Sequence, residues 1–299
     1  MEHTLSRTDV ALALPPDRAR WRQSVLARLL RIKLAVFGLA VIALVIFAAL
    51  FANVLAPYRP TELAGPPAAA PFTAGHVFGT DALGRDQLTR LMYGARASLR
   101  VSLLAVAISA LVGTVLGLLA AYFRGIVDSV LMRIIDAMLS LPGLVLPLTL
   151  LAVLGGGIVT VSIALGIAFI PITARLMRAQ ALGQMGRDYV LAARATGASH
   201  PRIMLRHIAP NCFAPIIVQA SLQMSVAVIA EAGLGFLGVG VTPPTPTWGN
   251  MLSGGFSSIR SEPWIVYAPA AAIFLLVLSF NFLGDALRDV LDPRLRGAT

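Results

Sequence analysis

Polar residues that could carry out chemistry are few in this sequence, and they are scattered along an apolar chain. Asp136, Glu231, Asn281 and Asp285 lie in or beside long apolar stretches. Ionisable groups inside a membrane are costly, and where they occur they often have a function. Arg133 and Arg288 lie one helical turn from Asp136 and Asp285, and that spacing predicts two structural ion pairs. Glu231 has no such local partner.

The sequence offers no nucleotide, metal or disulfide site. Residues 233–238, GLGFLG, match G-x-G-x-x-G, but a dinucleotide site needs a strand before this motif, whereas here it ends an apolar stretch. Lys33 is the only lysine and no G-x-x-x-x-G-K-[ST] occurs, so a P-loop is excluded. The four histidines are scattered and Cys212 is the single cysteine, which excludes zinc spacing and an internal disulfide. We predict no catalytic residue, cofactor or metal.

Composition indicates a membrane protein. Hydrophobic residues make up 57% of the chain and charged residues 13%, whereas soluble domains are about one quarter charged. The net charge of +10 could indicate a nucleic-acid partner. However, the basic residues alternate with apolar runs and form no basic face with interleaved aromatics, so membrane topology explains the charge better.

Six apolar runs are long enough to cross about 30 Å of hydrocarbon as helices. They lack the period-two alternation of barrel strands, so we predict an all-α, polytopic membrane protein. Pro142 and Pro147 in the third run, and Pro171 in the fourth, should kink or break their helices. The predicted spans are 34–56, 101–123, 134–154, 158–177, 213–237 and 264–284.

The basic residues predict which side each loop faces. Of the 24 basic residues, 18 lie on one side of these spans, namely before residue 34, in 124–133, in 175–206 and after 287. By the positive-inside rule, both termini and the connector 178–212 are cytoplasmic. The outer loops are then about 57–100 and 238–263, with Trp248 and Trp264 in an interfacial belt.

The first outer loop should end in an amphipathic helix that lies on the outer leaflet. Thr80 or Asp81 can cap this helix. Its apolar face would be formed by Leu88, Leu91, Met92 and Ala95.

The cytoplasmic connector contains RDYVLAARATGASHPRIMLRHIAPN at residues 187–211. Helical spacing gives its first half one small, weakly apolar face, formed by Tyr189, Ala192, Ala193 and Thr196. Gly197 allows a turn with positive φ. Ser199 and Pro201 suit the start of a second helix, with an apolar patch at Ile203, Met204 and Ile208 and an end at Pro210.

This predicted helix–turn–helix elbow has two interpretations. It could lie on the membrane surface with its arginines on lipid phosphates, or its tip could dock in a groove on another protein. A lipid-seeking face would be rich in large aromatics and leucines. The alanine, threonine and glycine of this tip favour docking.

Four stretches resemble a known family. AARATGAS followed by IMLRHIAPN resembles the EAA loop of binding-protein-dependent ABC importer permeases, with Leu191 where the family usually has glutamate. Residues 76–99, 231–252 and 280–296 resemble one branch, the C-type permease subunit of dipeptide, oligopeptide and nickel importers. The matches run from about residue 76 to 296.

The resemblance implies a type I importer fold, similar to the methionine permease, in the bacterial inner membrane. The implied parts are a cytoplasmic tail (1–33), a first helix (34–56), an extracytoplasmic loop (57–96), the transmembrane domain (97–286) and a cytoplasmic tail (287–299). The implied partners are a homologous permease, two ATPase subunits, an extracytoplasmic solute-binding protein and membrane lipid.

The same resemblance implies roles for single residues. The elbow would contact the ATPase through Tyr189, Ala192, Ala193, Gly197, Ala198, Ile203 and Pro210. Gln223 and Glu231 would face the transport path or the sister permease, although Gln219, Gln223 and Ser225 could also simply bond neighbouring helices. We expect a di- or oligopeptide substrate. The alternatives are nickel or another small solute, and, in another class, an ion-driven secondary transporter with carboxylates as coupling groups.

Overall fold

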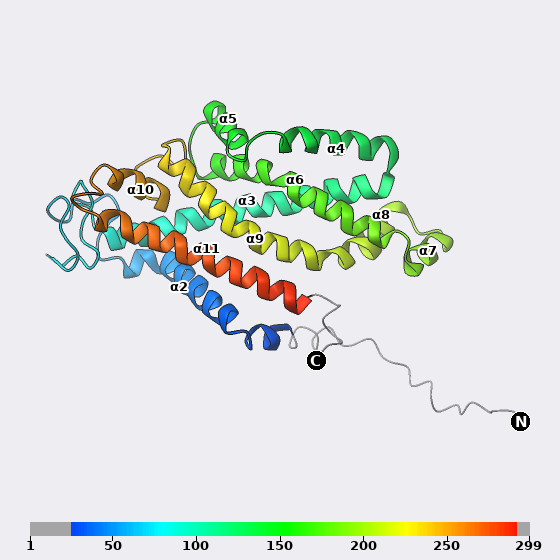
Figure 1. Ribbon diagram of the computed structural model, residues 1–299, viewed down its shortest axis with the longest axis horizontal. Coiled ribbons are helices and arrows are strands. Elements are labelled where there is room, and N and C mark those ends of the chain that lie inside the picture. The colour runs from blue at the N-terminus through cyan, green and yellow to red at the C-terminus, as the bar shows by residue number, and fades with distance from the viewer. Residues whose placement is uncertain (1–24, 74, 292–299) are drawn as a thin grey trace, which may run out of the picture.

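The computed structural model describes residues 25–73 and 75–291. This part of the chain is helical, without strands and with two isolated β-bridges near residues 73–86. Five helical runs are long and apolar enough to cross a membrane, and they lie side by side (Figure 1). They are α2 (Lys33–Leu55), α3 (Gln87–Phe123), α6 (Ile158–Gln184), the run His200–Phe236 and α11 (Trp264–Leu291). The all-α, membrane-spanning prediction is confirmed.

The predicted third span, 134–154, is built from two shorter helices. α4 (Gly125–Leu139) and α5 (Val145–Leu154) are separated by residues 140–144. Pro142 causes the break as predicted, because proline has no N–H and its ring clashes with the carbonyl four residues earlier. Pro147 lies in the first turn of α5, where it is tolerated, and Pro171 does not end α6.

The loops and short helices that connect the long helices lie at the two ends of the bundle. α7 (Asp188–Ala195) lies at one end, and α2 begins and α11 finishes toward it; we call this the elbow end (Figure 1). Segment 56–86 and α10 (Trp248–Phe256) lie at the opposite, outer end. The start of α2 and the finish of α11 thus lie toward the same end, as the predicted spans require, and which side of the membrane each end faces stays a prediction. Of the predicted tails, residues 1–24 and 292–299 lie outside the described residues, and α11 continues to Leu291.

The closest contact between helices joins α3 and α6. A Cβ at Gly113 would lie 2.7 Å from Thr173 Cβ, and one at Gly117 would lie 2.3 Å from the carbonyl oxygen of Ala174. A Cβ at Gly166 would lie 2.9 Å from Ile108 Cβ. Small residues let helix backbones approach closely, and van der Waals packing then replaces the hydrophobic effect that lipid cannot supply.

α3 differs from its prediction at the outer end. The expected separate amphipathic helix is the first part of one long helix that continues into the second span. Its N-cap is Asp86, whose Oδ2 accepts from the N–H of Thr89 at 2.7 Å. The predicted caps, Thr80 and Asp81, were therefore wrong, because the chain between them and the helix folds as a loop of its own.

The elbow continues into the fifth span without a stop at Pro210, contrary to the prediction. α8 (His200–Arg202), the π-helical turn η1 (Ile203–Ile208) and α9 (Ala209–Phe236) form one run. In η1 the N–H of Ala209 donates to the carbonyl of Met204, five residues back. The wider π turn accommodates Pro210, which follows η1 within this run and removes one main-chain hydrogen bond there.

The α3–α6 contact generates a prediction about stability. Gly117→Val should lower the free energy of unfolding by about 1–3 kcal/mol, as overpacking does elsewhere, because the new side chain meets the α6 backbone. The midpoint of thermal unfolding of the purified protein in detergent measures this. Gly183→Val, in α6, is the control and should not lower the midpoint, because none of the described residues has an atom within 4 Å of this Cβ position. Equal midpoints for the two variants would contradict the close contact.

Candidate coupling surface and polar sites

The elbow is anchored to the bundle by its inner face. Val190, Ala193, Ile203 and Ile208 are all buried in one apolar cluster with residues of α3, α6 and α9. Tyr122 of α3 adds a polar tie, with its Oη 2.6 Å from His200 Nδ1. The elbow is therefore held by the bundle as a rigid projection.

The turn of the elbow has the geometry predicted for Gly197. Its φ is +72°, and its N–H donates to the carbonyl of Arg194 at 3.0 Å. The N–H of Ala198 donates to the carbonyl of Ala193 at 3.1 Å, which completes a Schellman motif. Ser199 occupies the N-cap position of α8 as predicted, but its side chain makes no capping bond.

The outer face of the elbow is exposed, and it divides the predicted contact residues into two groups. Tyr189, Ala192, Gly197 and Pro210 are exposed, and Ala198 is half-buried. Ala193 and Ile203 belong to the anchored inner face, where Ile203 is only 2% exposed. Leu191, at 50% exposure, lies on the outer face with Tyr189. Of these predicted contact residues, only the exposed ones are accessible to a partner protein.

Gln223 holds three helices together in the middle of the bundle. Its Nε2 lies 3.5 Å from the carbonyl oxygen of Phe169 and 3.3 Å from Thr173 Oγ1, in α6. Its Oε1 lies 3.5 Å from Ser109 Oγ in α3. Ser109 and Thr173 are themselves 2.8 Å apart. The buried Gln223 side chain is thus engaged within its own chain.

Asn281 has a similar partner on α9. Ser225 Oγ donates to Asn281 Oδ1 at 3.0 Å and so joins α9 to α11. This hydrogen bond is enough to account for two polar residues in apolar helices, so neither residue requires a role in transport.

Glu231 is a buried carboxyl group without ordinary partners among the described residues. It is 1% exposed, and Ser98 and Thr247 are its polar neighbours from α3 and the start of α10. Neither carboxyl oxygen makes a hydrogen bond of ordinary length in the described part of the chain. Buried polar groups almost always have partners, so a movement of α9 against α3 or α10 that gives this carboxyl group a partner would be favourable.

The ion pairs differ from those the sequence predicted. Asp136 pairs with Arg175 of α6, not with Arg133, and both side chains are more than half exposed. Asp285 and Arg288 form no ion pair among the described residues. Asp128 of α4 instead binds Arg178 of α6 through two bonds of 2.6 Å, and this guanidinium lowers the pKa of the Asp128 carboxyl.

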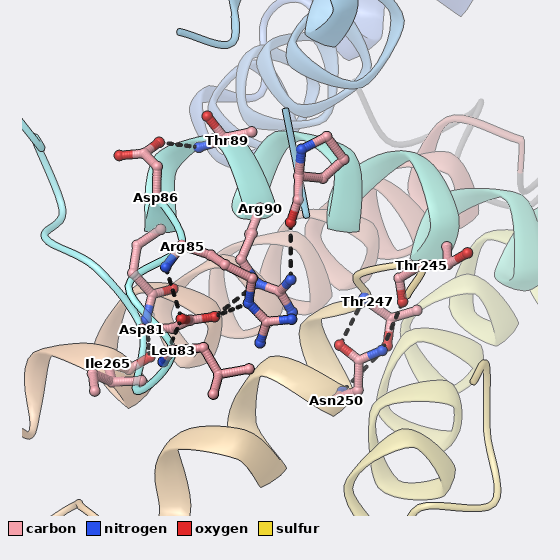
Figure 2. A network of polar contacts seen from close by, with 12 residues as sticks. Asp81, Leu83, Arg85, Asp86, Thr89, Arg90, Thr245, Thr247, Asn250 and Ile265 are labelled. Carbon is pink, nitrogen blue, oxygen red and sulfur yellow. Dashed lines mark hydrogen bonds and ion pairs between the residues drawn. The ribbon is translucent and has the colours of Figure 1, made fainter. Parts of the chain in front are cut away.

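A polar network fixes the segment before α3 at the outer end. Asp81 Oδ1 accepts from the N–H groups of Leu83 and Arg85, at 2.9 and 3.0 Å. Its Oδ2 binds Arg85 Nε at 2.6 Å and Arg90 Nε at 3.3 Å, so two guanidinium groups share one carboxylate (Figure 2). Arg90 also donates to the carbonyl of Pro60 at 3.1 Å.

The second outer loop has polar contacts of its own. Thr247 and Asn250 form a reciprocal capping box at the start of α10, and Asn250 Nδ2 donates to the carbonyl of Thr245 (Figure 2). Trp248 is buried and donates from Nε1 to the carbonyl of Leu91 at 3.0 Å. Trp248 therefore joins α10 to α3, and its predicted place in an interfacial belt is wrong.

A cavity of about 210 Å³ opens between the two outer loops. Both arginines of the network and the loop around Asp81 line one side, and Met251 and Ile265 line another. The outer end thus presents a rigid, basic hollow built from segments that are far apart in the sequence.

Comparisons with known proteins decide the family. Residues 113–297 match the family described as binding-protein-dependent transport system inner membrane component. Residues 20–71 match the N-terminal transmembrane domain of oligopeptide transport permease C. The chain belongs to this family of transport permeases. It is a multi-pass inner membrane protein and a transport subunit rather than an enzyme.

Named relatives are similar along almost the whole chain. The di/tripeptide transport system permease protein DppC of Pseudomonas aeruginosa is 42% identical over 99% of this chain and 98% of its own. The dipeptide transport system permease protein DppC of Escherichia coli K12 is 49% identical over 89% of this chain and 91% of its own. The resemblance to a C-type permease seen in the sequence motifs is confirmed.

Several structural residues were not singled out from the sequence. Arg175 and Arg178 appeared only as basic residues near a span, yet they hold α4 to α6. Their partners are 39 and 50 residues away, and such long-range pairs leave no local signal. The GTD and GRD triplets at residues 79–81 and 84–86 carried the signal for the outer network, because glycine beside aspartate is typical of tight, capped turns.

The position of Glu231 generates a prediction about transport. Glu231→Gln keeps the side-chain volume but replaces the carboxyl group with an amide that cannot ionise. We expect solute uptake to fall about ten-fold, equivalent to about 1.4 kcal/mol, with an unchanged amount of subunit in the membrane. Glu62→Gln, at an exposed outer-loop position, is the control and should leave uptake unchanged. Wild-type uptake by Glu231→Gln would show that the carboxyl group is merely tolerated.

Proposed function

We propose that this chain forms half of the transport path of an ABC importer for di- or oligopeptides. A homologous permease would form the other half, two ATPase subunits would drive the cycle, and an extracytoplasmic binding protein would deliver the peptide. The elbow would be the surface on which an ATPase subunit acts. The family membership and the peptide-permease names of relatives 42–49% identical to the chain support the substrate class.

The observation that carries the coupling role is the form of the elbow. Its inner face is buried in the bundle, while Tyr189, Leu191 and Ala192 are exposed on its outer face. No atom of the described chain lies within 4 Å of a Cβ placed at Gly197. A rigid helical projection with a small tip suits a helix-in-groove contact. Leu191 suits a groove with an apolar lining, whereas the EAA loop that this segment resembles usually has glutamate at this position.

The continuity of the elbow with α9 explains how such a contact would act on the path. α8, η1 and α9 form one helical run, so a force on the elbow is transmitted along the helix that carries Gln223 and Glu231. In this arrangement Gln223 keeps α9 attached to α3 and α6, and Glu231 lies at the part of α9 nearest the outer loops. Both side chains are buried within the chain in this conformation. We propose that Glu231, rather than Gln223, meets the path or the sister permease when α9 moves against α3 and α10.

The docking role predicts a defect at the elbow tip. Gly197→Val should abolish stimulation of ATP hydrolysis by peptide-loaded binding protein, because valine resists positive φ at about 1–3 kcal/mol and projects toward the partner. Gly197→Asn separates the two causes, since asparagine tolerates this conformation. If a side chain at the tip blocks close approach of the partner, Gly197→Asn should lose the stimulation as well. The measurement is the ATPase rate and subunit stoichiometry of the purified complex. Full stoichiometry with normal stimulation in Gly197→Val would contradict docking.

The proposed orientation has its own test. Both termini and the elbow should be cytoplasmic, and segment 56–86 should lie outside. Reporter domains fused after Thr299 or inserted at Gly186 should give cytoplasmic signals, and one inserted near Ala69 should give an outside signal. An outside signal at Gly186 would remove the elbow from the reach of any ATPase and would overturn the coupling proposal.

A further inference from the structure

The break between α4 and α5 leaves main-chain groups without hydrogen-bond partners. The carbonyls of Met138 and Gly143 would normally bond the N–H groups four residues later, but those residues are Pro142 and Pro147. The N–H groups of Leu141 and Gly143 also lack a partner in the described part of the chain. Every residue from 140 to 144 is exposed. The two prolines therefore create a short stretch of open main chain.

This open main chain cannot face lipid. Counted from residue 134, where the predicted span begins, the break starts about 9 Å into the hydrocarbon at 1.5 Å per residue. Unsatisfied main-chain groups cost several kcal/mol each in hydrocarbon, and non-helical backbone occurs at membrane depth only against protein or water. Leu144 lies 3.9 Å from the Cβ position of Gly233 in α9, so the break is adjacent to the helix that carries Glu231.

A neighbouring ion pair indicates water rather than a dry contact with another subunit. Asp136 lies one turn before the break, and its carbonyl accepts from the N–H of Ser140 at 3.0 Å. Its carboxylate pairs with Arg175, and the two side chains are 55% and 53% exposed. A dry interface would have to desolvate this pair and the open main chain together, which is costly. A water-filled space that is continuous with the cytoplasmic side, where the basic-residue pattern places Arg175, satisfies both.

We propose that residues 140–144 line the transport path and bind the main chain of the peptide in transit. Unpaired N–H and C=O groups on this stretch would bond the C=O and N–H groups of the cargo, as an added strand does at a sheet edge. Gly143 has no side chain, and no atom of the described residues lies within 4 Å of its Cβ position, so its main chain is open to approach. Main-chain recognition does not depend on side chains. This inference rests on the proposed peptide function.

Cysteine accessibility in membrane vesicles that contain the complete transporter tests the proposal. Gly143→Cys and, as a second position, Leu141→Cys should react with a membrane-impermeant thiosulfonate about ten-fold or more faster than Leu44→Cys. Leu44 is 65% exposed in the middle of α2 and represents a lipid-facing site. The single native cysteine, Cys212, is buried, so the unsubstituted chain serves as the blank.

Cargo protection tests the peptide contact. Binding protein loaded with a dipeptide, added with ATP, should slow the reaction at position 143 several-fold, and dialanine and diphenylalanine should protect alike. Slow reaction at both substituted positions would place the break against another subunit or lipid and overturn the proposal. Fast reaction without protection, or protection by one dipeptide only, would overturn main-chain recognition. Dipeptide uptake by the unsubstituted transporter is measured in the same vesicles; its absence would overturn the proposed function instead.

Discussion

The close approach of α3 to α6 is the contact on which the rest of the structure depends. Lipid provides no hydrophobic force between helices, so association requires short distances and interhelical hydrogen bonds. Gly113, Gly117 and Gly166 supply the short distances, and Ser109 with Thr173 supplies a buried hydrogen bond in the same contact. Gln223 then adds α9 to this pair. With 37 residues, α3 extends about 55 Å. It therefore reaches both functional ends, bonding the elbow through Tyr122 and α10 through Leu91.

α9 connects the two ends in a different way. It begins as the second arm of the elbow and finishes at the outer end, where a Cβ at Gly249 of α10 would lie 2.5 Å from the carbonyl oxygen of Ala232. One helix thus contacts the coupling surface, the central hydrogen bonds and the outer loops. The π-helical turn η1 lies where this run leaves the elbow, and such turns often occur at functional sites. A displacement of the elbow would reach Glu231 along this one continuous helical run, and the bonds of Gln223 would share it with α3 and α6.

The sequence predicts those features of the fold that depend on local composition. Long apolar runs must be helical in lipid, so the spans follow from length alone, and Pro142 and Gly197 determine a break and a turn through their own backbone chemistry. Features that depend on distant partners were missed. Asp136 pairs with Arg175 rather than with its neighbour Arg133, and Trp248 is buried against α3 rather than placed at an interface. The sequence predicts a helix end at Pro210, because the π turn that widens the helix and accommodates this proline has no sequence signal. The elbow residues were predicted as one surface, but Ala193 and Ile203 face inward because the bundle supplies a cluster that the local pattern cannot show.

The distribution of polar groups has a consequence for selectivity. Several interior polar side chains of the described residues bond one another, as Gln223 does with Thr173 and Ser225 with Asn281, so these are not free to recognise a passing solute. A path that distinguished cargo by its side chains would need such free groups at fixed positions, and each would favour some sequences over others. Open main chain at residues 140–144 has no such preference, because every peptide carries the same amide groups. A peptide permease with this arrangement would leave sequence selection to the binding protein and ask of its own path only that the cargo be a peptide.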